Sequence, residues 1–118
     1  MEAEQGIEEL IEAMSRSDRR AAKSQLVRLM KHIIKWKHQP DKRTVSWVTT
    51  ILNARLEIRE EQEENPSITD EEIKTKIWEK AFRIAVNEAA GEMGLEKLRT
   101  EELTWEEVFE RHYTLAEA

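Results

Sequence analysis

The sequence predicts an all-α protein, a single helical domain over residues 1–118 built as a bundle of about five helices. Its 118 residues match the length of one domain. Only three glycines and two prolines interrupt a chain that is 37% charged, and apolar residues recur at three- and four-residue spacing. Two long central helices, joined at a proline-containing turn, are expected to dominate the bundle.

Two helices are expected before the first proline. The first runs from about Glu2 to Met14 and ends near Ser15, and Ser17 then caps a second helix that ends before Pro40. The apolar arc of the second helix comprises Ala22, Leu26, Val27, Leu29, Met30, Ile33, Ile34 and Trp36. An arc this wide, about half of the circumference at 100° per residue, is typical of a central helix.

A tight turn should follow the second helix, because a proline disfavours helical geometry for the residue before it. The next helix is expected from about Thr44 to Glu64. Trp36 and Trp47 lie on the apolar arcs on either side of the turn, so we expect both to be buried and to pack against each other. The corner motif that carries this expectation consists of Trp36, Gln39, Pro40, Arg43, Ser46 and Trp47.

Two capping boxes organise the C-terminal half. Thr69 with Glu72 predicts the start of a helix that continues to about Glu92 and is ended by Gly91 and Gly94. The same pattern recurs further on, before a last short helix. Its residues are Thr104 and Glu107 for the box, and Trp105, Val108 and Phe109 for the apolar side.

Several stretches of the chain together resemble a known family of small helical proteins, largely cyanobacterial. They are EELIEAMSRSDRR (8–20), LVRLMKHIIKWKHQP (26–40), RTVSW (43–47) with Ile51 and Arg55, NPSI (65–68), NEAAGEMGL (87–95) and LTWEEV (103–108). The chain is similar to members of domain-of-unknown-function family 29. The resemblance implies a helical fold and supplies no activity.

The resemblance also implies two departures. Family members begin with a further aromatic, acidic segment, and a residue that resembles a glutamate position in them is Leu10 here. We therefore expect helix one to expose an apolar patch of Ile7, Leu10 and Ile11, which a second copy of the chain would cover in a homodimer. A different protein could fill the same patch.

Charged residues within the predicted apolar stripes need partners. Arg55, with Arg59 beside it, falls inside the stripe of the third helix, and Glu88 falls inside that of the fourth. We expect Arg55 to form a buried ion pair with Glu88, or with Glu9 or Glu12 of helix one. The alternative interpretation is an anion pocket around the same residues.

Charge is unevenly distributed along the chain. Residues 1–15 hold five acids and no base, whereas residues 16–43 hold ten bases and two acids, in a chain whose net charge is −6. A basic face of helix two carries Arg20, Arg28, Lys31 and Lys35. Nucleic-acid or other polyanion binding along this row is one interpretation; the favoured one is a face that is solvated or paired within the protein.

No set of residues indicates catalysis, a cofactor or a metal. There is no cysteine, which removes disulfides and thiolate chemistry. His32 and His38 are six residues apart, whereas zinc-binding histidines on one helical face are four apart. The sequence also lacks a secretory signal and a bilayer-spanning apolar run, so a cytoplasmic, non-membrane setting is expected.

The function indicated by these observations is protein association, either with another protein or with a second copy. Nucleic-acid binding through helix two is the first alternative. An enzyme of unassigned reaction is the least favoured, with no catalytic residue to name.

Overall fold

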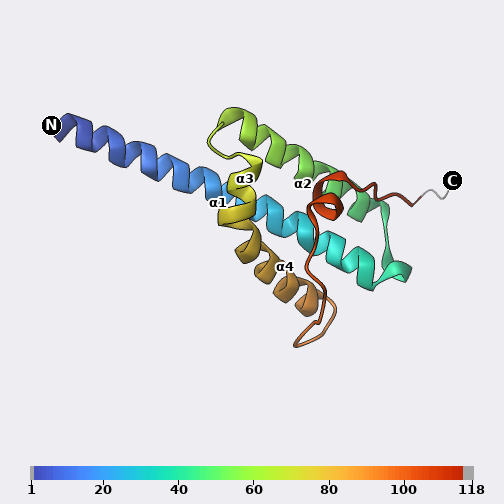
Figure 1. The fold of residues 1–118 in the computed structure, drawn as a ribbon. Coiled ribbons are helices and arrows are strands. Elements are labelled where there is room, and N and C mark those ends of the chain that lie inside the picture. The colour runs from blue at the N-terminus through green and yellow to red at the C-terminus, as the bar shows by residue number, and fades with distance from the viewer. Residues whose placement is uncertain (1, 116–118) are drawn as a thin grey trace.

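Helix α1, Glu2–His38, forms the axis of the molecule. This computed structural model describes the backbone of residues 2–115 and the side chains of residues 16–115. Over that range the chain forms helices and loops and no strand, which confirms the all-α prediction. The molecule measures 60 × 34 × 21 Å, and its long dimension follows from the length of α1, about 55 Å at 1.5 Å per residue. Figure 1 shows the first half of α1 extending beyond the other helices.

The predicted break between the first two helices is wrong, because α1 continues through residues 15–17 without interruption. No glycine or proline lies between Gly6 and Pro40, and serine in a helix interior costs only a few tenths of a kcal/mol relative to alanine. Nothing local therefore stops the helix. The merger leaves α1, α2, α3 and α4 as the α-helices of the described residues, instead of about five.

The predicted apolar arc of α1 is confirmed. Its members from Ala22 to Trp36 are all buried. Helices α2 and α4 pack against opposite sides of this arc, so α1 is covered along its second half and the core runs beside it. Partly buried aromatic and aliphatic side chains of the C-terminal segment complete the core.

The chain reverses at the corner as predicted. Helix α1 ends at His38, a 3-10 turn follows at Pro40–Lys42, and α2 runs over Val45–Glu64. Thr44 caps α2, because its Oγ1 accepts a hydrogen bond from the backbone N–H of Trp47 at 3.2 Å. Ser46 lies exposed in the first turn of α2.

Trp36 is buried, but its predicted packing against Trp47 is wrong. Its ring instead meets Tyr113 edge-on, with a centroid distance of 5.6 Å. Arg43 lies over the same indole at 4.6 Å and donates from Nε to the carbonyl oxygen of Trp36 at 3.0 Å. Trp47 is partly buried against the core, and the Lys35 ammonium lies over its ring, 4.8 Å from the ring centre. The aromatic contact of Trp36 therefore comes from the C-terminal segment, whose position sequence spacing could not predict.

The fourth predicted helix forms in three pieces. Thr69 caps α3, Asp70–Glu72, a π turn follows at Ile73–Ile77, and α4 runs over Trp78–Glu92. The buried residues then recur at every fourth position, as Ile73, Ile77, Ala81, Ala85 and Ala89. Glu88 was predicted to lie inside this stripe, and both Glu88 and the apolar Ile84 are exposed. A strict four-residue step drifts around the helix and moves them to the edge of the apolar side.

Gly94 ends the helical region, as predicted, with φ at +75°. The backbone N–H of Leu95 donates to the carbonyl oxygen of Ala90 at 2.8 Å, which satisfies the last turn. Gly91 lies inside α4, so it does not help to end the helix. The remaining chain crosses the bundle toward α2 (Figure 1) and buries Leu103, Val108 and Tyr113.

The two glycines should respond oppositely to alanine. Gly94→Ala should destabilise the fold by about 1 kcal/mol, because a side chain is strained at positive φ. Gly91→Ala should stabilise it by about 0.5–1 kcal/mol, because a Cβ there meets no atom within 4 Å and favours the helix. Urea unfolding of both variants checks the signs, and a stabilised Gly94→Ala would contradict the assigned helix end.

Candidate interaction surfaces

Arg55 anchors the C-terminal segment to α2. Its Nε donates to the carbonyl oxygen of Val108 at 2.7 Å and its Nη2 to that of Glu107 at 3.2 Å. The guanidinium also lies 5.5 Å from the centre of the Tyr113 ring. The predicted ion pair with Glu88 is therefore wrong, because Glu88 pairs with Lys31 instead. The alternative of an anion pocket at Arg55 stays a prediction. Burial lowers the pKa of Arg55 without removing its charge.

Glu107 joins three parts of the molecule. Its carboxylate accepts from the backbone N–H of Thr104 at 3.0 Å and pairs with Lys37 of α1 at 2.7 Å. The Thr104 hydroxyl accepts from the backbone N–H of Glu107 at 3.1 Å, so the predicted capping box is complete. Burial disfavours the charge of Glu107, but the hydrogen bonds from Lys37 and Thr104 outweigh it and lower the pKa. The box holds a π turn at Glu106–Glu110.

Tyr113 adds a second donor to the same carbonyl oxygen that Arg55 contacts. Its hydroxyl donates to Glu107 O at 2.7 Å. Burial raises the pKa of Tyr113 to about 12, so the phenol keeps the proton that it donates. Arg55, Glu107 and Tyr113 therefore form a structural tie between α2, α1 and the end of the chain.

Helix α4 neutralises part of the predicted basic face. Lys31 lies 3.1 Å from Glu88 and 2.9 Å from Glu92, and Lys35 lies 2.8 Å from Glu92. Burial disfavours the charge of Lys31, but its hydrogen bonds to Glu92 and Glu88 raise its pKa. Arg28 contacts Gln25 at 3.4 Å. Internal pairing therefore interrupts the predicted basic face at Lys31 and Lys35. This agrees with the favoured interpretation, a face that is solvated or paired within the protein.

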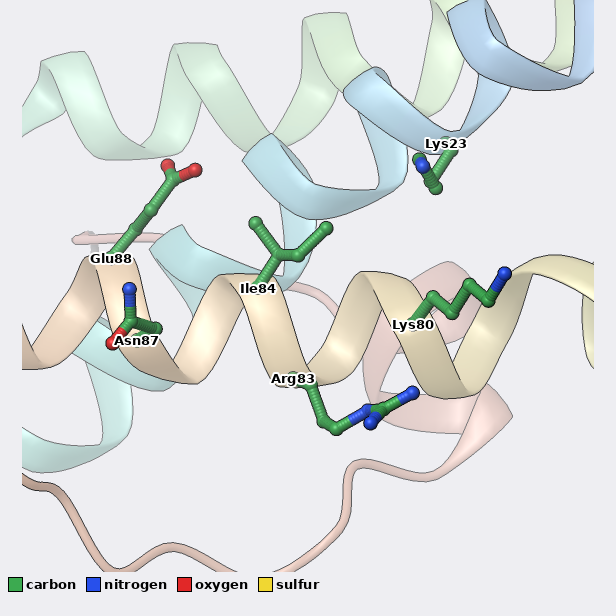
Figure 2. Close-up of a pocket in the computed structure, with 6 residues that line it drawn as sticks. All are labelled: Lys23, Lys80, Arg83, Ile84, Asn87 and Glu88. Atoms are coloured by element: carbon green, nitrogen blue, oxygen red, sulfur yellow. The ribbon is translucent and has the colours of Figure 1, made fainter.

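The remaining bases gather in a groove between α1 and α4. One hollow of about 320 Å³ is lined almost entirely by cations, which are Arg16, Arg19, Arg20, Lys23, Lys76 and Lys80, together with Ile77. A second hollow of about 410 Å³ continues it along α4 and shares Lys23 and Lys80. We call this continuous depression the α1–α4 groove. Figure 2 shows Ile84 and Glu88 extending from α4 on the side of α1, with Arg83 on the other side of α4.

Few of the groove cations are paired. Arg19 Nε lies 2.8 Å from Glu72 Oε1, without hydrogen-bond alignment. Arg20, Lys23, Lys76 and Lys80 make no ion pair with any other residue whose side chain is described. Neighbouring like charges at one-turn spacing, such as Lys76 and Lys80, destabilise a helix slightly. Glu88 at one end of the groove is paired with Lys31, so Arg20, Lys23, Lys76 and Lys80 leave the groove with an excess of positive charge.

Helix α2 is apolar on two sides. Its core side buries Ile51, Ala54 and Ile58. Its outer side exposes Val45 by 69% and Leu52 and Leu56 by 57% each. These three side chains lie close to one line along the helix, since seven residues make nearly two turns. We call this line the α2 stripe. A helix with two apolar sides gives no single periodic stripe, so its exposed apolar residues cannot be told from its core residues by spacing alone.

An aromatic cluster outside the sequence predictions joins α4 to the C-terminal π turn. Trp78 stacks on Trp105 with centroids 5.6 Å apart, and Trp105 meets Phe109 at 4.3 Å. Arg59 lies over Phe109 at 4.7 Å and pairs with Asp70 at 2.8 Å. Arg59 is thus a cation over an aromatic cluster and not a member of a core ion pair. Only tertiary contact brings these distant segments together.

Other sequence predictions have separate outcomes. Glu9, Glu12, Ile7, Leu10 and Ile11 lie outside the residues whose side chains are described, so the predictions on them stay open. His32 Nδ1 lies 2.8 Å from the carbonyl oxygen of Arg28, and burial lowers its pKa. Among the described side chains no three groups cluster as metal ligands. None of the described helices is long and apolar enough to cross a membrane.

Removing the Arg55 guanidinium should loosen the C-terminal tie. We expect Arg55→Ala to lower the free energy of unfolding by about 2–3 kcal/mol, because charged hydrogen bonds to backbone oxygens are lost. Arg55→Lys should not restore it, since one ammonium cannot replace the two-pronged guanidinium. Arg83→Ala, at an exposed residue, is the control. Equal stability of the Arg55 and Arg83 variants in urea unfolding would refute the tie.

The ion pair of Glu107 should make stability depend on pH. A carboxyl whose pKa is lower in the folded state stabilises the fold above its unfolded pKa, here 4.5, and loses that contribution as the pH falls through the folded pKa. Glu107→Gln should cost about 1–2 kcal/mol at neutral pH, and the difference should shrink below pH 4.5. Exposed Glu110→Gln is the control. A difference that stays constant down to the acid transition would contradict the assignment.

Comparison with known proteins places the chain in a family. No match was found among curated proteins or solved structures. The family model described as "Domain of unknown function DUF29" matches residues 1–114, which is nearly all of the 118 residues and includes the corner, both capping boxes and the Arg55 tie. The chain therefore belongs to the DUF29 family, whose biochemical function is unknown.

Proposed function

We propose that the protein is a non-catalytic association module that binds a helix of a partner protein along the α2 stripe. The observation that carries this proposal is the exposure of Val45, Leu52 and Leu56 on the outer side of α2. Aliphatic side chains aligned on one helix face, separate from the core face, form a patch suited to contact with another apolar surface. Single exposed leucines are ordinary, whereas an aligned set on a helix calls for a partner.

The charges around the α2 stripe define the partner's chemistry. The C-terminal half of α2 is acidic, with Glu57, Glu60, Glu63 and Glu64 exposed, and no base lies in its last turn. Acids at a helix C-terminus are unfavourable beside the negative end of the helix dipole. A partner helix with an apolar edge and basic flanks would cover the stripe and relieve this charge. In such a contact the partner helix would use apolar side chains spaced three and four residues apart.

The proposal of a non-catalytic module also draws on the role of the prominent polar side chains in holding the fold. The polar groups that stand out are the half-buried Arg55 and the buried Glu107 and Tyr113. Arg55 and Tyr113 donate to backbone oxygens, and the Glu107 carboxylate is held by Thr104 and Lys37. A general acid or base must reach a substrate, and these groups reach only the protein itself. They support a structural role.

The stripe can be tested with charge placed at its centre. Leu52→Glu with Leu56→Glu should abolish the capture of a partner that the unmodified protein retains, because an apolar contact cannot bury unpaired carboxylates. Asn53→Glu, exposed on the neighbouring position of the same helix, should leave capture unchanged. Circular dichroism should show all three proteins equally helical.

The partner assignment needs a direct measurement. We expect a captured protein to contain a helical segment with a basic flank. A peptide of that segment should bind the protein in titration calorimetry, and its affinity should be lost for the variant with Leu52→Glu and Leu56→Glu. Equal capture by the double variant and the unmodified protein would refute binding at the stripe.

A further inference from the structure

We infer that the α1–α4 groove receives residues 2–15 of a second copy of the chain, so that two copies form a reciprocal dimer. This surface lies on the opposite side of α1 from α2, so the inference does not rest on the α2 stripe and the two proposals fail separately. The receiving side is made of described residues. The inserted side is defined by its sequence and by the course of the α1 backbone.

The lining of the groove specifies an acidic occupant with an apolar edge. Arg20, Lys23, Lys76 and Lys80 present four cations that no described side chain neutralises. Between them the floor is aliphatic, with Ile77 buried and Ile84 exposed by 38%. A nucleic-acid strand would match the charge, but the lining offers no aromatic side chain on which a base could stack. An acidic amphipathic helix matches both the charge and the aliphatic floor.

Residues 2–15 have this composition. They contain five glutamates and no base, with Ile7, Leu10, Ile11 and Met14 as their aliphatic residues. The segment is the first part of α1, and it extends away from the bundle in Figure 1. Its charge is therefore opposite to that of the groove, and its aliphatic residues recur at helical spacing.

The continuity of α1 decides that the contact is between molecules. Residues 2–15 and Arg16–Lys31 belong to one uninterrupted helix, and a helix cannot fold back onto its own following turns. A copy of the segment from a second molecule can lie there if the two α1 helices run antiparallel about a two-fold axis near residue 15.

The lengths agree with this arrangement. Fourteen helical residues extend about 20 Å, and the α4 side of the groove, from Lys76 to Glu88, extends about 18 Å. The same operation places the first copy's segment in the groove of the second, so both acidic segments and both grooves are used.

Charge exchange between two variants tests the inference. The groove variant carries Lys76→Glu and Lys80→Glu, on exposed residues of the π turn and α4. The segment variant carries Glu8→Lys and Glu12→Lys. Each variant alone should dimerise about a hundredfold more weakly than the unmodified chain, because both of its reciprocal contacts are repulsive. Lys42→Glu, exposed in the turn after α1, should dimerise normally.

Mixing the two variants should restore the dimer. In the mixed pair the lysines of one segment meet the glutamates of the other chain's groove, while the second contact joins unmodified surfaces. Sedimentation velocity of each variant and of the equimolar mixture measures this, with circular dichroism to confirm that each variant is folded. The unmodified dimer should also weaken as sodium chloride rises.

Two outcomes would overturn the inference. One is an unmodified chain that stays monomeric throughout the micromolar range. The other is a dimer that is unaffected by the groove variant or not restored in the mixture. If a labelled single-stranded DNA bound the monomer, and this binding was lost in the groove variant, the groove would instead be a binding site for a nucleic-acid backbone.

Discussion

Burial of the second half of α1 is the constraint on which the rest of the structure depends. Its apolar arc, from Ala22 to Trp36, covers about half of the helix and cannot be hidden by one neighbour. Helices α2 and α4 therefore pack on opposite sides of it. The corner at Pro40 returns the chain along one side, and the loop at residues 65–69 leads it to the other. The first half of α1 is not covered by α2 and α4 and extends outward from the bundle.

The C-terminal segment turns this three-helix arrangement into a closed structure. It contains little regular helix, so its polar backbone needs partners from elsewhere. Arg55 supplies two donors to its carbonyl oxygens, Lys37 holds Glu107, and Tyr113 packs on Trp36. These charged and aromatic side chains contact the protein's own backbone and rings.

Placement of α2 and α4 on either side of α1 also separates the surface charges. Along α4, Glu88 and Glu92 neutralise Lys31 and Lys35, whereas the groove beside Lys76 and Lys80 keeps its positive charge. Along α2, the cleft next to α1 is acidic, with Glu57, Glu60, Glu61 and Glu64 in its lining. The two clefts on either side of α1 therefore carry opposite charge.

Local chemistry determined much of this protein from the sequence alone. Pro40 ended a helix, Thr69 and Thr104 formed the predicted caps, and Gly94 accepted positive φ, because each effect acts within a few residues. Tertiary structure decided the partners. Arg55 bound backbone oxygens in place of Glu88, and Tyr113 replaced Trp47 beside Trp36. Helical periodicity states which side of a helix a residue occupies, whereas the partner on that side depends on how distant segments cross. The groove and the α2 stripe arise only when those segments are assembled.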